Sequence, residues 1–230
     1  MPMRLAKPSI DIGLSTNALA PMLAFWQQDI GVAFGHLLKI RAGLDQHRHD
    51  LMGSVLKINH VAEPLPDTAP TGYRELIIAR DGLGVPRSSA DPDGNLVRLV
   101  PPGEAGVSQI GVRLVVRDLQ PHRAFYRQAL GLEEKPWPAG AAFQVGDSLL
   151  LVEESAEATA DAPLQGRGWR YLTFQVFEVD AEHARILGQG GREAMPPTTL
   201  GTTARISMVK DPDGNWIEIS QRASLTGPLP

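Results

Sequence analysis

The chain has 230 residues, 43% of them hydrophobic, and a formal net charge of −4, as in a globular protein with one large core or two modest ones. It has no cysteine, which excludes disulfides, thiolate nucleophiles and cysteine-based metal centres. Because it shows no basic run, no apolar stretch of about 18 residues and no apolar leader, we expect a cytoplasmic protein without nucleic-acid or membrane partners.

The first predicted unit covers residues 8–63 and consists of a strand, a helix and further short strands. In its last strand, Lys57 and Asn59 alternate with apolar residues, so these two share one face. His47 alternates with His49 in the preceding polar hairpin, and both project from one face. A hairpin with solvated imidazoles is the favoured interpretation, and a ligand or metal site that includes His47 is the alternative.

A second, shorter unit ends in the pentapeptide DPDGN, which fills residues 91–95 and recurs at 211–215. Each copy predicts a turn, because Asp side chains cap backbone N–H groups, Pro fixes φ and Gly takes the left-handed conformation. An alternating strand follows each copy. The stretch from Gly72 to the first copy is 24 residues shorter than that from Gly168 to the second, so this unit is predicted to lack its helix.

The third and fourth predicted units fill residues 108–222. The third begins with a strand over 110–116 and continues into a helix that Asp118 caps and Gly131 ends, followed by two short strands around a Gly-Asp turn. The fourth repeats this order, with a helix capped by Asp180.

The two halves of the chain repeat each other. Residues 10–31 align with residues 110–131 and are identical at eight positions. The string GYREL from Gly72 likewise aligns with GWRYL from Gly168. The predicted fold class is therefore α+β, built from tandem βαβββ units of which the second is truncated.

Tandem units with FYRQALGLEE after the third unit's first strand and KDPDGNWIEIS closing the fourth resemble the vicinal oxygen chelate superfamily of glyoxalases, bleomycin-resistance proteins and extradiol dioxygenases. The resemblance implies curved mixed sheets, each with a concave face that forms a cup and a convex face covered by helices. It also implies a degenerate N-terminal domain over 1–102 and a complete C-terminal domain over 107–224. We expect the working cup in the second domain, because residues 108–222 keep both full units.

In metal-dependent members of that superfamily, a His or Glu on the first strand of each unit and a Glu after the final turn hold a divalent ion. Gly111 and Tyr171 occupy the first-strand positions in the C-terminal half, and only Glu218 matches. In the N-terminal half Asp11 and Glu75 are accompanied by Arg98, a combination expected to form an ion-pair cluster. We therefore predict no cofactor, with Fe, Mn, Ni or Zn as the disfavoured alternative.

The residues expected to line the C-terminal cup are Tyr171 and Thr173 on one strand and Trp216 and Glu218 on another. The resemblance also places the helices over Leu56 and Ile58, so Lys57 is expected to face a cup. An aromatic wall, a phenol and a carboxylate suit a small, partly aromatic or polar ligand. The alternative for Glu218 is an ion pair with Arg113 or Arg205.

Three functional classes stay open for a monomer or homodimer of this chain. The first is a protein that binds a small organic molecule without the usual metal ligands, with Lys57, His47, Glu75, Thr173 and Trp216 as candidate ligand-binding residues. The second is a dioxygenase or glyoxalase-like lyase, either metal-dependent with unusual ligands or using Glu218 as a base and Tyr171 as an acid. The third is a dimeric interaction module that offers sheet edges to a partner.

Overall fold

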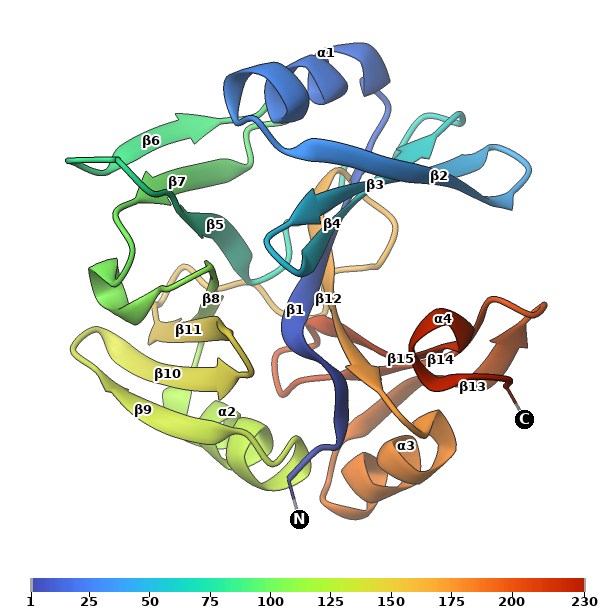
Figure 1. The fold of residues 1–230 in the computed structure, drawn as a ribbon. Coiled ribbons are helices and arrows are strands. Elements are labelled where there is room, and N and C mark those ends of the chain that lie inside the picture. Colours follow the sequence, from blue (N-terminus) through green and yellow to red (C-terminus); the bar gives the residue numbers. More distant parts are fainter. Residues whose placement is uncertain (1, 230) are drawn as a thin grey trace.

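The computed structural model describes residues 2–229, which form two curved mixed sheets of eight and seven strands (Figure 1). In sheet A the edge strands lie farther from sheet B than the central strands do, so sheet A opens away from sheet B (Figure 1). The strands of sheet A, in spatial order, are β13 (Arg192–Leu200), β14 (Ala204–Lys210), β15 (Trp216–Arg222), β12 (Gly168–Val176), β1 (Leu5–Thr16), β4 (Ser54–Val61), β3 (Leu44–Leu51) and β2 (Ala33–Arg41).

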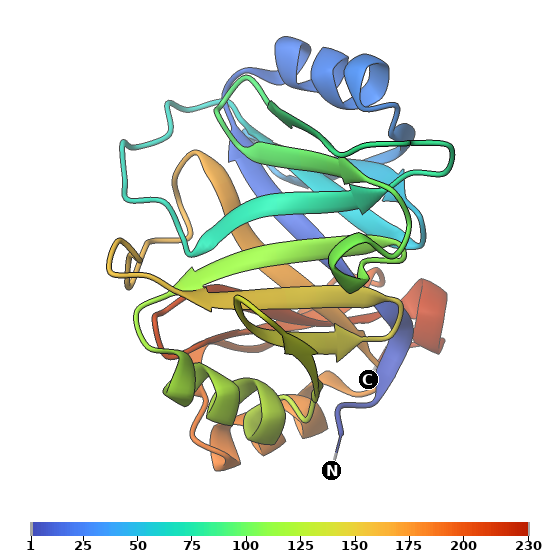
Figure 2. The same ribbon diagram turned by 90° about the vertical axis from the view of Figure 1, so that its left-hand side faces the viewer.

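Sheet B faces the viewer in Figure 2, with helix α1 above it and helix α2 below it. It opens in the direction opposite to sheet A (Figure 1). Its strands, in spatial order, are β6 (Arg87–Ala90), β7 (Leu96–Val100), β5 (Tyr73–Ala79), β8 (Ile110–Val116), β11 (Ser148–Glu154), β10 (Gly140–Val145) and β9 (Glu133–Trp137).

Each sheet combines one unit from either half of the chain. Sheet A joins the first unit to the fourth through antiparallel β1 and β12, and sheet B joins the second to the third through β5 and β8. The expectation that residues 108–222 form a concave sheet of their own is therefore wrong, because β12 pairs with β1 and not with β8. The domain boundaries 1–102 and 107–224 remain a prediction, and each sheet contains strands from both of these segments.

The helices begin and end near the predicted residues, but the predicted cap at Asp180 is wrong, because Asp180 lies inside its helix and Glu178 precedes it without a side-chain cap. α1 (Leu19–Ala24) and α2 (Leu119–Ala124) each continue into a π-helical turn, η1 (Phe25–Asp29) and η3 (Phe125–Ala129), and α3 (Val179–Gly188) belongs to the fourth unit. The side chain of Asp118 accepts a hydrogen bond of 2.9 Å from the backbone of Gln120, which confirms the predicted cap. In the described part of the second unit the chain runs through β5, β6 and β7 without a helix, as predicted. There are two further short helices: η2 (Glu104–Gly106) lies between β7 and β8, and α4 (Ala223–Thr226) follows β15.

The two DPDGN turns connect the sheets reciprocally. Asp91 accepts a hydrogen bond of 2.9 Å from the backbone of Asn95, and the carboxamide oxygen of Asn95 accepts one of 3.1 Å from the backbone of Trp169, at the start of β12. The carboxamide oxygen of Asn215 in the second turn accepts one of 2.6 Å from the backbone of Gly72, just before β5. Each turn thus satisfies a buried donor of the opposite sheet, which accounts for the asparagine in both copies.

The core lies between the sheets and the helices. Ile12 of β1, Leu172 of β12 and Val112 of β8 belong to one buried apolar cluster that contains residues of both sheets. Leu56 and Ile58 belong to the same cluster, so the prediction for the two faces of β4 is confirmed. Among residues 2–229, none of the helices has the length and apolarity to cross a bilayer.

Candidate functional site

The concave face of sheet A carries buried polar side chains where the opposite face is apolar. Alternation along the strands places one set in the core and the other on the concave face. Such a set is costly to bury unless its members satisfy one another or meet a ligand. The polar set includes Asp11 on β1, Arg48 on β3, Lys57 on β4, Tyr171 and Thr173 on β12, and Glu218 on β15.

Lys57 lies at the centre of this face. Its ammonium group donates hydrogen bonds to Thr173 Oγ1 at 2.6 Å and to Glu218 Oε1 at 2.9 Å. The Lys57 side chain is 2% exposed and that of Glu218 is 13% exposed. Burial lowers the pKa of Lys57, and the negative charges of Glu218 and Asp11 partly oppose this effect.

The structure thereby identifies the ionic partner of Glu218. We considered Arg113 and Arg205 from the sequence, and both are wrong, because Arg113 contacts Glu75 and Glu153 in sheet B. Arg205 pairs with Asp180 on the surface. Neither carries a charge to the concave face of sheet A.

Tyr171 lies over Gly13 of β1. A Cβ atom on Gly13 would lie 2.3 Å from two ring carbons of Tyr171, so only glycine leaves room for the phenol. The phenol oxygen accepts hydrogen bonds from Asn59 Nδ2 at 3.2 Å and Gln46 Nε2 at 3.3 Å. Burial and the charge of Glu218 raise the pKa of Tyr171, so the group stays protonated at neutral pH. Both amide neighbours donate to the oxygen, so the hydroxyl proton has no acceptor within residues 2–229.

Asp11 is already surrounded by donors. Its carboxylate contacts the Lys7 ammonium group and accepts hydrogen bonds from the Val55 backbone at 2.8 Å and from Gln175 Nε2 at 3.0 Å. Gln175 Oε1 is buried and has no hydrogen-bond partner within residues 2–229. Asp11 is thus a structural anion, while the Gln175 carbonyl is an unmatched acceptor.

Trp216 forms one end of the concave face, beside Tyr171 across the parallel pairing of β12 and β15. The indole Nε1 donates a hydrogen bond of 2.8 Å to the carbonyl of Ala162, and the Lys210 ammonium group lies 4.2 Å from the centre of a Trp216 ring. These contacts fix the ring orientation. The predicted aromatic wall therefore consists of Trp216 and Tyr171 on adjacent strands.

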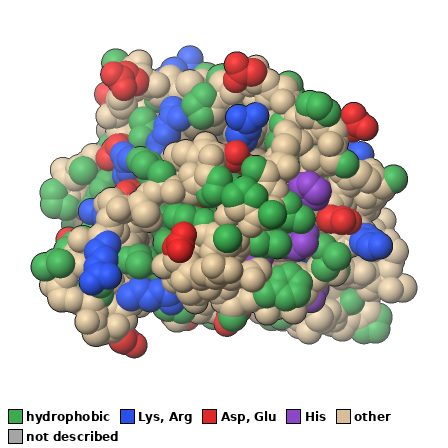
Figure 3. All heavy atoms as spheres, turned by 90° about the horizontal axis from the view of Figure 1, so that it is seen from above, with side chains coloured by type: hydrophobic (Ala, Val, Ile, Leu, Met, Phe, Trp, Pro, Cys, Tyr) green, Lys and Arg blue, Asp and Glu red, His purple; other side chains and the backbone are tan. Residues whose placement is uncertain are grey.

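Two predicted residues lie elsewhere. His47 pairs with Ile58 of β4, so it belongs to the face of β3 opposite Lys57, near the ring of Phe34 at 6.3 Å. Figure 3 shows histidines beside hydrophobic side chains on the molecular surface. Glu75 lies in sheet B, where it contacts Arg98 at 3.8 Å.

The concave face of sheet B differs from that of sheet A. Val107 packs over Gly111, where a Cβ would approach Val107 Cγ2 to 2.9 Å. Both residues adjoin a second buried apolar cluster that includes Ile77 and Leu151. The predicted cluster of Asp11, Glu75 and Arg98 does not form, because Asp11 belongs to the other sheet. Apolar packing thus occupies the centre of the concave face of sheet B.

The donor set of sheet A does not fit a divalent metal ion. Tyr171, at a first-strand position of this sheet, is a protonated phenol, which is a poor metal ligand. Glu218, at the last-strand position, is already paired with the cation Lys57 at 2.9 Å. Asp11 is held by Lys7, and within residues 2–229 no three His, Asp or Glu side chains gather as a metal site requires. An ammonium group supplies the positive charge at this point of the sheet.

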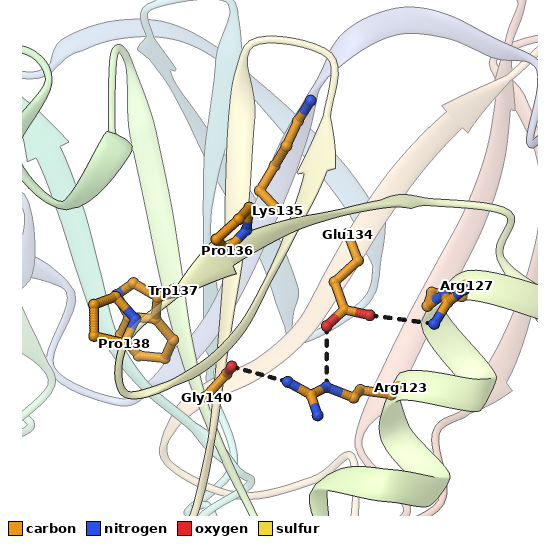
Figure 4. A pocket seen from close by; sticks show the side chains of 8 residues that line it. All are labelled: Arg123, Arg127, Glu134, Lys135, Pro136, Trp137, Pro138 and Gly140. Atoms are coloured by element: carbon orange, nitrogen blue, oxygen red, sulfur yellow. Dashed lines mark hydrogen bonds and ion pairs between the residues drawn. The ribbon is translucent and has the colours of Figure 1, made fainter.

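A surface hollow between α2 and β9 is a separate feature (Figure 4). Glu134 contacts Arg123 at 3.0 Å and Arg127 at 3.6 Å, and Arg123 also donates to the carbonyl of Gly140 at 3.2 Å. The carboxylate of Glu134 thus neutralises the guanidinium groups in this hollow, whereas Arg48 in sheet A has no ion pair within residues 2–229.

Sequence reasoning missed Arg48 and Gln46, which share the face of Lys57 through the pairing of β3 with β4. Arg48 Nη1 donates to Gln46 Oε1 at 2.7 Å. Alternation alone indicated that Gln46 and Arg48 point the same way. Only the strand register shows that this direction is toward Lys57.

Comparison with known proteins identifies the fold. Residues 107–219 match the family model described as Glyoxalase/Bleomycin resistance protein/Dioxygenase superfamily. Glyoxalase I from Zea mays is similar in structure, with a TM-score of 0.74, 14% identity and coverage of 93% of this chain and 92% of that one. A dioxygenase candidate from Bacillus subtilis gives a TM-score of 0.69 at 10% identity, covering 96% of this chain and 86% of that one. The search of curated proteins gave no match.

Proposed function

This chain belongs to the Glyoxalase/Bleomycin resistance protein/Dioxygenase superfamily, and from that premise we propose that it binds a small organic molecule on the concave face of sheet A without a bound metal ion. The observation that carries the proposal is the position of Lys57, whose ammonium group joins Thr173 and Glu218 at the centre of that face. A fixed cation there takes the place of a metal in organising the surrounding oxygens.

The surrounding groups support binding of an organic ligand. Tyr171 keeps a hydroxyl proton that its two amide neighbours leave unused. Trp216 adds an apolar ring whose orientation is fixed by the carbonyl of Ala162. A concave surface with a fixed aromatic ring and a few oriented polar groups is typical of small-molecule sites.

The enzymatic alternative receives less support from the same contacts. A general base must reach a substrate proton, but Glu218 Oε1 already accepts a hydrogen bond from Lys57. Tyr171 is suited to donate a hydrogen bond, and its raised pKa makes it a weak proton donor for catalysis. We therefore propose binding as the function, with Tyr171 and Glu218 as ligand-contacting residues.

The test is a thermal-shift screen of small aromatic, diol and thioether compounds on the wild-type protein and on Tyr171→Phe. We expect at least one compound to stabilise the wild type and to lose most of its effect in Tyr171→Phe. Glu134→Gln, in the separate surface hollow, is the control and should respond as the wild type does. Binding that is unchanged in Tyr171→Phe would contradict this site.

Elemental analysis of protein purified without chelator tests the metal-independent part of the proposal. We expect well below one equivalent of Fe, Mn, Ni or Zn per chain. A near-stoichiometric metal that persists in the wild type and disappears in Glu218→Gln would contradict it.

A further inference from the structure

Resting on the proposed function, we infer that the ligand of sheet A carries an oxyanion group, a carboxylate or a phosphate, that binds the buried guanidinium group of Arg48. This assignment goes beyond the presence of a binding site, since it fixes the charge of the ligand and the side chain that receives it. It depends on which charges of the concave face are already matched.

The two central carboxylates have their own cations. Glu218 pairs with Lys57 at 2.9 Å, and Asp11 pairs with Lys7. Asp11 gains two further donors from the Val55 backbone and the side chain of Gln175. Neither carboxylate is therefore left to neutralise another basic side chain.

Arg48 is buried without an anion. Its side chain projects from β3 on the face of Lys57, and the residue is 5% exposed. Within residues 2–229 it forms no ion pair, and its Nε atom has no hydrogen-bond partner. Its recorded hydrogen bond is to the neutral carbonyl of Gln46, at 2.7 Å. An incoming anion supplies the charge-assisted hydrogen bonds that this buried guanidinium lacks.

Arg222 adds a second positive charge to the same face of the sheet. It shares the face of Glu218 on β15 and is half-buried, and within residues 2–229 it too lacks an ion-pair partner. Burial and the positive charge of Arg48 lower the pKa of Arg222, and the charges of Glu218 and Asp11 oppose this effect. His36 on β2 pairs with Arg48 across the strands, and both arginines help to lower its pKa after burial.

The result is an unpaired positive charge close to the phenol of Tyr171. Gln46 accepts a hydrogen bond of 2.7 Å from Arg48 Nη1 and donates one of 3.3 Å to the Tyr171 hydroxyl. Guanidinium groups bind carboxylates and phosphates through paired hydrogen bonds. A ligand with an acidic group and an aromatic body fits a guanidinium group that lies near Tyr171.

The experiment measures binding of benzoate, phenyl phosphate and inorganic phosphate by isothermal titration calorimetry, with benzamide as the neutral counterpart. We expect an acid to bind at least tenfold more tightly than benzamide and to weaken as NaCl is raised. Arg48→Gln should reduce the affinity about tenfold or more, and Arg48→Lys should give an intermediate loss. Arg205→Gln, whose partner is the surface residue Asp180, is the matched control and should change nothing.

The separate acids distinguish the two kinds of oxyanion, because preference for phenyl phosphate or benzoate assigns a phosphate or a carboxylate. Equal binding of benzamide and benzoate that still depends on Tyr171 would overturn the anion assignment and leave the proposed function intact. Failure of all three acids to bind at millimolar concentration would also overturn it. Loss of binding in Arg205→Gln to the same degree as in Arg48→Gln would show a general charge effect and contradict the assignment.

Discussion

Replacing Lys57 or Glu218 singly should destabilise the protein far more than replacing both. The two charged groups are 2.9 Å apart, and their attraction is about 6 kcal/mol at an effective dielectric constant of about 20. Burial of each ion costs several kcal/mol, so the pair contributes little net stability. Removing one partner leaves the other ion buried and unpaired, which typically destabilises a protein by about 3–5 kcal/mol.

The two single changes are not equivalent. In Lys57→Met, water can reach the remaining carboxylate, which is 13% exposed, so we expect a loss of about 3 kcal/mol. In Glu218→Gln, the ammonium group is 2% exposed and keeps Thr173 as an acceptor, so the loss should be nearer 4–5 kcal/mol at neutral pH. The lysine can also lose its proton, and this sets an upper limit on the cost. Deprotonating a lysine at pH 7 costs about 5 kcal/mol, because pH 7 lies about 3.5 units below its ordinary pKa and each unit corresponds to about 1.4 kcal/mol.

The assay is urea unfolding followed by far-UV circular dichroism, for the wild type, both single variants and the double variant. We expect the double variant, Lys57→Met with Glu218→Gln, to lie within about 2 kcal/mol of the wild type. Single losses below about 1 kcal/mol that simply add in the double variant would refute this reasoning. Such a result would mean that water already screens the pair.

The pH dependence gives a second readout. The pKa of Lys57 lies below the ordinary 10.5, so between its folded value and 10.5 the unfolded chain binds more protons and stability rises with pH. Glu218→Gln removes a charge that raises this pKa, so the window should extend toward neutral pH. An unchanged pH profile in Glu218→Gln would show that the carboxylate does not act on Lys57.

Four further substitutions test other parts of the structure. Asn215→Ala and Asn95→Ala should each cost about 1–3 kcal/mol in urea unfolding, because each leaves a buried backbone donor of the opposite sheet unpaired. Gly13→Ala should displace the phenol ring above it, and we expect a loss of about 1–3 kcal/mol together with loss of ligand binding in the thermal-shift screen. Burial alone would lower the pKa of His122, but the carboxylate of Asp211, 3.5 Å from Nε2, outweighs it and raises this pKa above 6.5. The resulting stability is present below pH 6.5 and is lost as pH rises through the raised value, and His122→Gln should flatten this part of the stability profile.

The order of the elements could be predicted because its signals are local. The cap at Asp118, the end of the helix near Gly131 and the turn at residues 91–95 depend on neighbours a few positions away. The shortened second unit followed from the length of chain between two such signals. The π-helical turns at Phe25 and Phe125 have no comparable signal, because the same residues fit a regular α-helix.

The pairing of the units could not be predicted from the same signals. β1 could pair with the first strand of any other unit and bury the same apolar face, and alternation does not choose among them. The choice depends on contacts such as those of Asn95 with Trp169 and Asn215 with Gly72, between residues far apart in the chain. Tyr171, Thr173 and Glu218 were placed correctly on one face, while the neighbour that unites them, Lys57, comes from the opposite half of the chain.

The internal repeat explains why the centre of the concave face is polar in sheet A and apolar in sheet B. Lys57 and Thr173 align in the repeat with Leu151 and Ile77, and the latter two lie at the centre of the concave face of sheet B. In sheet A these positions carry an ammonium group and its hydroxyl acceptor. In sheet B they carry aliphatic side chains that pack together under Val107 and need no ligand. Equivalent backbones therefore carry different side chains at this point, and specific binding should follow the side chains of sheet A, where Arg48 Nε and Gln175 Oε1 lack hydrogen-bond partners within residues 2–229.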